Sequence, residues 1–169
     1  MGGETRLTEF GEIVHHEWFK AEEIRPRVRL NKDEFVVMPN HIHGVIWLLE
    51  GDVGARRRRA PTREQFGKPV PGSIPSIIRS FKSACTRRFN TLKGISGTSV
   101  WQRNYFEHII RTEASLNKIR RYIQDNPERW HLDRYNPEAG GVDPLAHDVC
   151  ENLKHDAESG VLEMIKDES

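Results

Sequence analysis

The sequence predicts an α+β fold, in which helices pack against an antiparallel sheet, and three observations support this. The chain of 169 residues is long enough for one domain and an extension. Its 36% hydrophobic and 30% charged residues are typical of a folded globular protein. Segments with the periodicity of amphipathic helices are separated by short segments rich in β-branched and aromatic residues, as in folds that mix helices and strands.

The composition and the first residues also limit the cellular location that we expect for the protein. The longest apolar run, Gly44 to Leu49, is much shorter than the roughly 20 residues that span a bilayer. The first residues lack the apolar segment of a secretory signal. Cys85 and Cys150 are too few and too far apart for a disulfide framework or a cysteine-rich zinc site. We therefore expect a cytoplasmic protein with reduced cysteines and no membrane partner.

The first third of the chain predicts a helix followed by a β-hairpin. Leu7 to Glu23 has apolar residues three or four positions apart, and Thr5 or Thr8 can serve as its N-cap. Arg27 to Met38 and Ile42 to Leu49 have the alternation and branched residues of strands. Because only a short turn separates these two strands, we expect them to pair antiparallel.

The middle of the chain predicts a loop, a helix, a strand and a further helix. Residues 51–75 form a basic loop without apolar periodicity, and Ser73 or Ser76 can cap the helix that follows. Trp101 to Ile110 predicts a third strand, and Thr112 to Asn126 predicts a helix that the next proline ends.

The order of these elements is that of a ferredoxin-like sandwich, an antiparallel sheet with helices on one face, whose first strand is absent. We expect this domain to occupy residues 1–130. Residues 131–169 are acidic and weakly periodic, which predicts a loosely attached tail with short helices near Val149 to Lys154 and Val161 to Ile165.

The net charge of +1 conceals a strong asymmetry along the chain. Residues 51–121 contain 16 basic and 4 acidic side chains, whereas residues 122–169 contain 4 basic and 12 acidic ones. A basic block of this size favours a polyanionic partner, because lysine and arginine displace counterions from phosphates. Solvated helix faces would give the same pattern.

Two groups of residues suggest chemistry. His41 and His43 are two positions apart on a predicted strand, so their imidazoles share one face and can hold one divalent ion, although two exposed surface histidines would look the same. On the last predicted helix, Lys118, Tyr122 and Asn126 form a row at four-residue spacing. This row offers a cation, a phenol and an amide, although a tyrosine packed at a helix edge is the common alternative.

Longer motifs around these groups resemble a known family. The segment Val36 to Gly44 resembles the His-hydrophobic-His motif of HUH endonucleases. The segments Trp101 to Arg111 and Ile119 to Pro127 are similar to the strand and catalytic helix of REP-associated tyrosine transposases, which are related to single-tyrosine insertion-sequence transposases. The resemblance covers residues 7 to 130, and members usually begin with a strand that this chain lacks.

The resemblance implies a metal-assisted transesterification. Tyr122 would be the nucleophile, with Tyr105 as its rival, and His41, His43 and Asn126 would bind Mg²⁺ or Mn²⁺, with a phosphate contact as the other role for Asn126. The partner would be single-stranded or hairpin DNA, and a homodimer is possible. The residues expected to hold the DNA are the basic ones: Arg56, Arg57, Arg58, Arg59, Arg87, Arg88, Arg103, Lys118, Arg120 and Arg121.

Two other functions stay open on the sequence. One is a DNA-hairpin-binding remnant of such a transposase that no longer cleaves. The other is a metal-dependent phosphoesterase that uses water, with Tyr122 in a structural role. A DNA adduct distinguishes the three functions, because only the first attaches DNA covalently to the protein.

Overall fold

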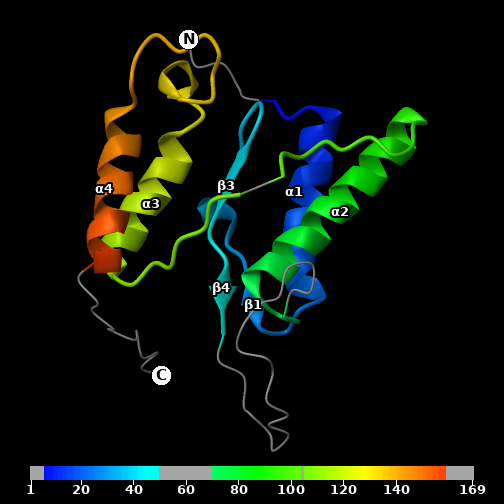
Figure 1. Ribbon diagram of the computed structural model, residues 1–169, viewed down its shortest axis with the longest axis horizontal. Coiled ribbons are helices and arrows are strands. Elements are labelled where there is room, and N and C mark those ends of the chain that lie inside the picture. The colour runs from blue at the N-terminus through cyan, green and yellow to red at the C-terminus, as the bar shows by residue number, and fades with distance from the viewer. Residues whose placement is uncertain (1–5, 50–69, 104, 159–169) are drawn as a thin grey trace, which may run out of the picture. The chain divides into compact units, whose positions relative to one another are not determined.

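The computed structural model describes residues 6–49, 70–103 and 105–158 (Figure 1). The chain forms two compact units: Met1–Leu30 with Ile46–Arg103, and Asn31–Val45 with Asn104–Ser169. Residues on both sides of the predicted boundary at residue 130 belong to the second unit. Most of the predicted basic loop, residues 50–69, and the predicted helix at 161–165 lie outside the described residues.

The first unit is built on two helices that pack on each other, α1 (Glu9–Glu23) and α2 (Ile74–Lys93). Each N-cap is one of the two candidates expected from the sequence: the Thr8 side chain accepts from the amide of Gly11, and the Ser73 side chain accepts from the amide of Ser76. Gly94, in the left-handed region at φ 65°, ends α2. The buried apolar residues of this unit are Ile13, Val14, Trp18, Ala21, Val28, Ile77, Phe81 and Cys85.

Short strands in each unit come from the predicted hairpin. In the first unit β1 (Val28–Arg29) pairs antiparallel with β4 (Trp47–Leu48). In the second unit β2 (Phe35–Val37) pairs antiparallel with β3 (Ile42–Gly44), so that Val36 lies opposite His43. The antiparallel pairing is confirmed, but each predicted strand is interrupted. The first is interrupted by a 3₁₀ turn, η1 (Lys32–Glu34), which the Asn31 side chain caps.

Two helices lie side by side in the second unit, α3 (Glu113–Asp125) and α4 (Pro144–Glu158) (Figure 1). Thr112 caps α3 as predicted, and a further 3₁₀ turn, η2 (Trp130–Leu132), follows that helix. The helix α4 is longer than the predicted one, and its Val149 and Leu153 are buried. These two side chains, with Leu116 and Ile123 of α3, are part of the apolar core of the unit.

Two expectations about the sheet need comment. The third strand predicted over residues 101–110 is wrong: among its described residues none is in a strand, and Phe106 and Ile109 are 79% and 70% exposed. The mixture of helices and antiparallel strands agrees with an α+β fold, but the ferredoxin-like sandwich is not confirmed, because the described strands form two separate two-stranded sheets. None of the described helices is long and apolar enough to cross a membrane.

Candidate functional site

The hairpin of the second unit brings the two predicted histidines together. His41 directly precedes β3 and His43 lies within it, so strand alternation places both imidazoles on one face. Their Nε2 atoms are 2.9 Å apart, and the two rings meet edge to face. Two nitrogen ligands about 2.1 Å from one ion, at right angles, would be separated by about 3.0 Å. The spacing of these imidazoles therefore fits a shared ion.

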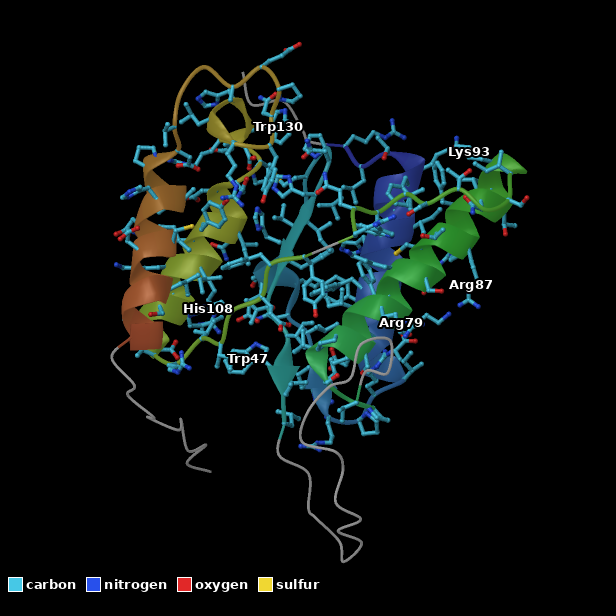
Figure 2. All side chains as sticks on the ribbon, viewed as in Figure 1. Trp47, Arg79, Arg87, Lys93, His108 and Trp130 are labelled. Carbon is cyan, nitrogen blue, oxygen red and sulfur yellow. The ribbon has the colours of Figure 1, made fainter. Side chains whose placement is uncertain are left out.

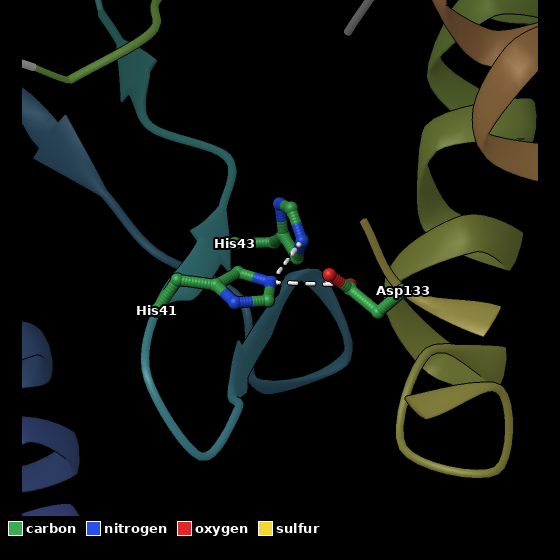
Figure 3. Close-up of side chains that lie close together, drawn as sticks. All are labelled: His41, His43 and Asp133. Carbon is green, nitrogen blue, oxygen red and sulfur yellow. Dashed lines mark hydrogen bonds and ion pairs between the residues drawn. The ribbon is translucent and has the colours of Figure 1, made fainter. Parts of the chain in front are cut away.

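A carboxylate completes this cluster. Asp133, directly after η2, is only 5% exposed, and its Oδ2 lies 3.4 Å from Nε2 of His41 (Figure 3). Its other oxygen, Oδ1, accepts a hydrogen bond from the amide of Tyr135 at 2.7 Å, which fixes the carboxylate. One ligand atom from each of the three side chains lies within 4.8 Å of the others. His41, His43 and Asp133 thus form a possible metal-binding triad.

The hydrogen bonds around His41 test whether a cation fits. The Nδ2 amide of Asn40 donates to the carbonyl of Tyr135 at 2.7 Å, so its Oδ1 faces Nδ1 of His41, 2.8 Å away. Because Oδ1 only accepts, His41 donates from Nδ1, and its Nε2 carries a lone pair. That nitrogen lies 2.9 Å from Nε2 of His43 and 3.4 Å from Oδ2 of Asp133, so two nitrogen atoms and a carboxylate oxygen that can all act as ligands converge on one point. The site therefore fits a bound cation.

The electrostatics of the histidines favour their metal-binding form. Burial, with a smaller contribution from the neighbouring His41, lowers the pKa of His43 to about 4, against an opposing effect of Asp133. Burial also lowers the pKa of His41, while Asp133 opposes the shift. Both imidazoles are therefore neutral near pH 7, and a neutral imidazole is the form that coordinates a metal.

Tyr122 lies beside the triad. It projects from α3, its hydroxyl is 3.5 Å from Nε2 of His43, and the two ring centroids are 5.0 Å apart. Burial raises the pKa of the phenol, with an opposing contribution from the Asn126 amide. Asn126 is 1% exposed, and its Nδ2 has no hydrogen-bond acceptor among the described residues. The rival Tyr105 is exposed, and its hydroxyl donates to Glu107.

A buried ion pair links the hairpin to the helix that carries Tyr122. The carboxylate of Glu34, which is 0% exposed, lies 2.8 Å from Nε and Nη2 of Arg120 on α3. The carbonyl of Glu34 accepts from the amide of Val45, directly after the histidine strand. The same guanidinium also contacts Glu113. Arg120 therefore helps to hold the histidines near Tyr122.

The other predicted DNA-binding residues differ in their availability. Arg88 is ion-paired with Glu17 at 2.8 Å, and Lys118 is ion-paired with Asp148 at 3.4 Å. The side chains of three arginines, Arg87, Arg103 and Arg121, are exposed (Arg87 is labelled in Figure 2). The segment Arg56 to Arg59 lies outside the described residues.

Sequence reasoning missed Asp133, which belongs to the predicted acidic tail. Asp133 lies outside the strand of His43 and the helix of Tyr122, so no helix or strand periodicity relates it to them. The turn η2 and the turns around it bring Asp133 to the site. One signal was present in the sequence. Two aromatic residues, Trp130 and Tyr135, flank this aspartate, and their ring centroids lie 6.1 and 5.0 Å from that of His41.

Comparisons with known proteins give two relatives. No protein-family model and no solved structure matches the chain. An uncharacterized protein of Haemophilus influenzae is 40% identical over 133 residues, which are 76% of this chain and 71% of that protein. A second protein of Haemophilus influenzae, named "Putative REP-associated tyrosine transposase", is 29% identical over 92 residues.

The second match covers 54% of this chain and only 46% of the transposase-named protein, so it supports no more than a distant relation. The first match is longer and closer. The chain therefore belongs to the same family as the 40% identical Haemophilus influenzae protein, and it is distantly similar to one named as a REP-associated tyrosine transposase.

Proposed function

We propose that this chain cleaves and rejoins single-stranded or hairpin DNA through a covalent bond to Tyr122, assisted by a divalent cation. The observation that carries the proposal is the 3.5 Å between the Tyr122 hydroxyl and Nε2 of His43, a member of the possible metal-binding triad. A phenol next to metal ligands suits nucleophilic attack on a phosphate. The name of the distant relative supports the same chemistry.

The cation would be Mg²⁺ or Mn²⁺, held by His41, His43 and Asp133. Carboxylate oxygen suits both ions, but imidazole is a poorer ligand for Mg²⁺, so this set of donors favours Mn²⁺. When bound, the ion supplies Lewis-acid stabilisation of the charge that develops on the scissile phosphate. Asn126 as a further ligand stays a prediction, and its buried Nδ2 is also suited to donate to a phosphate oxygen.

The protein's part in the reaction is to supply and orient the phenol. The Tyr122 oxygen forms a bond to phosphorus while the bond from phosphorus to the 3′ oxygen breaks, which leaves a 5′-phosphotyrosine and a 3′-hydroxyl. Because burial raises the pKa of Tyr122, its proton stays on the phenol at rest and leaves as the new bond forms. That proton is finally carried by the 3′ oxygen. A DNA 3′-hydroxyl reverses the step and joins strands without ATP.

Basic side chains would hold the DNA backbone. Arg121, Arg103 and Arg87 are exposed and suited to phosphate contacts, and the Arg56 to Arg59 run adds four charges. Arg88, Arg120 and Lys118 already contact carboxylates, so we expect them to contribute less to DNA binding.

The test is a DNA adduct that survives denaturant. The protein is mixed with a hairpin-flanked single strand and Mn²⁺, and adducts are resolved on a denaturing gel. We expect the wild type and Tyr105→Phe to form the adduct, and Tyr122→Phe, which loses only a hydroxyl, to bind the DNA without forming it. His43→Ala should also fail. An adduct in Tyr122→Phe would overturn the choice of nucleophile.

The same experiment separates the other functions. Product strands without an adduct would indicate a phosphoesterase that uses water. Binding without cleavage or adduct would indicate a non-catalytic hairpin-binding protein, and either result would contradict the proposal.

A further inference from the structure

A cleft in the first unit is separate from the candidate metal centre. It has a volume of about 330 Å³, and α2 forms one wall while residues 99–103 form the other. Two hydrogen bonds hold this segment along the helix: Asn90 donates to the carbonyl of Thr98 at 3.2 Å, and Lys82 donates to the carbonyl of Gln102 at 3.0 Å. The second wall therefore has a defined position against α2.

The charge of the cleft points to an anionic ligand. Lys82, Arg87 and Arg103 line it, and no carboxylate is among its described lining residues. Elsewhere on this unit, Arg88 is paired with Glu17 and Lys93 with Glu9. Within residues 6–49 and 70–103, by contrast, neither Arg87 nor Arg103 is paired with a carboxylate. Their guanidinium groups are free to bind phosphate oxygens.

An aromatic ring stands beside these cations. Trp101 lines the cleft, and its ring packs on Phe10 and Phe81 with centroids 5.8 and 5.4 Å apart. Phe81 is 4% exposed, so the indole rests on the core of the unit and has little freedom to move. A fixed ring next to cations is the combination that binds unpaired bases: the base stacks on the ring and its phosphates contact the arginines.

We propose that this cleft binds one unpaired nucleotide of a single-stranded nucleic acid, with its base against Trp101 and its flanking phosphates on Arg87 and Arg103. Ser83 and Thr86 add hydroxyl groups to the same wall. The cleft is a second binding site, built from residues other than those of the metal centre. The choice of a single-stranded nucleic acid as the partner rests on the proposed function. Binding in this cleft involves no metal and no cleavage.

The first test measures binding by fluorescence anisotropy. The full chain is titrated into a labelled oligothymidylate of about 12 nucleotides, in EDTA so that the metal centre takes no part. Arg87→Ala and Arg103→Ala should each weaken binding and reduce its salt dependence. Lys20→Ala removes one charge from an exposed position of α1 outside the cleft and serves as the control. Equal effects of all three changes would overturn the proposal.

A second pair of variants tests the cleft without changing the core: one variant should block it, and the other is its control. Ser83→Glu places a carboxylate in the cleft, whereas Ser80→Glu places the same group on the same helix outside it. Both side chains are exposed, so neither change should unfold the unit. Binding should fall much further with Ser83→Glu, and equal losses would contradict a site in the cleft.

The role of the base is tested with an oligonucleotide whose sugars carry no bases. The wild type should bind it more weakly than oligothymidylate, by roughly fivefold or more, since stacking on one ring contributes that much. Trp101→Leu should abolish this difference, and Trp101→Phe, which keeps an aromatic ring, should retain part of it. A difference that persists in Trp101→Leu would overturn the stacking role. Comparison with oligouridylate shows whether DNA or RNA is preferred.

These results are independent of the adduct experiment. If the adduct forms but the cleft variants bind as the wild type does, the cleft proposal is wrong and the proposed function is retained. If the cleft variants lose binding but no adduct forms, the cleft is retained and the proposed function is wrong.

Discussion

The two units of this protein present their polar residues in opposite ways. In the second unit His41, His43 and Asp133 are largely buried, and hydrogen bonds from Asn40 and Tyr135 fix the orientation of His41 and Asp133. In the first unit the cleft contains Arg87 and Arg103, which are exposed and have no carboxylate partner among the described residues of that unit. Bond-making chemistry requires fixed geometry, whereas binding a flexible strand requires accessible charge and an exposed ring face.

The ion pairs show the same contrast. Arg120 lies against a fully buried carboxylate of Glu34, whereas Lys93 and Glu9 in the first unit are both exposed. Exposed pairs are screened by water and contribute little to stability. An arginine opposite a buried carboxylate is costly to remove, because the carboxylate then loses its partner without regaining water.

The largest expected effect follows from this difference. Arg120→Ala should lower the free energy of unfolding by about 3 kcal/mol, measured by urea denaturation. Lys93→Ala should change it by less than about 1 kcal/mol. The neighbouring Arg121, which is exposed, provides a control of the same residue type on the same helix, and Arg121→Ala should be nearly neutral. If Arg120→Ala and Arg121→Ala lowered the free energy of unfolding by similar amounts, the structural role assigned to Arg120 would be wrong.

The buried histidines should make the stability of the metal-free protein depend on pH. The pKa of His43 is about 4 in the folded chain and 6.5 in its ordinary environment, and His41 shifts in the same direction. Below pH 6.5 the unfolded chain therefore takes up protons that the folded chain does not. Above pH 7 neither state binds these protons, so the protein keeps its full stability. The free energy of unfolding should then fall by roughly 2–3 kcal/mol as the pH falls from 6.5 to 4.

Denaturation in EDTA at several pH values measures this effect. Because carboxyl groups in general also take up protons toward the lower end of this range, the informative quantity is the difference between the wild type and His43→Gln. That difference should grow in favour of the variant as the pH falls. A difference that is constant with pH would show that His43 is not buried in its neutral form.

A smaller effect tests the role of Asp133. Asp133→Asn removes one negative charge but keeps the size of the side chain, so it should weaken Mn²⁺ binding by roughly tenfold or more in isothermal titration calorimetry. Asp125→Asn makes the same chemical change at an exposed position of α3 and should leave the affinity unchanged. Equal heats from the wild type and Asp133→Asn would exclude this aspartate as a ligand.

The local features of the fold could be predicted from the sequence, and its long-range contacts could not. Helix caps act over three residues, so the sequence predicts Thr112 as a cap and narrows the caps of α1 and α2 to two candidates each, of which Thr8 and Ser73 are the ones observed. The start of α4 was also readable, because the Asp143 side chain accepts from the amide of Leu145 and Pro144 takes the first helical position. The acidic composition of the segment, which predicts a loosely attached tail, hides this local signal.

The errors concern residues whose partners are distant in the sequence. The stretch from Tyr105 to Ile110 is rich in aromatic and β-branched residues, as strands are, but a strand also needs a neighbour to pair with, and among the described residues none pairs with it. The pairing of His41 with His43 followed from strand periodicity. Asp133 reaches them only through η2, a turn that no spacing rule anticipates.

The most direct test of the central claim is to identify which residue carries the DNA. The three tyrosines of this chain fall on different tryptic peptides: Asn104–Arg111 contains Tyr105, Tyr122–Arg129 contains Tyr122, and Tyr135–Lys154 contains Tyr135. After reaction with a hairpin-flanked strand and Mn²⁺, nuclease and trypsin digestion should leave a residual nucleotide mass on the peptide Tyr122–Arg129 in tandem mass spectrometry. A nucleotide on either of the other two peptides, or on none, would contradict the account.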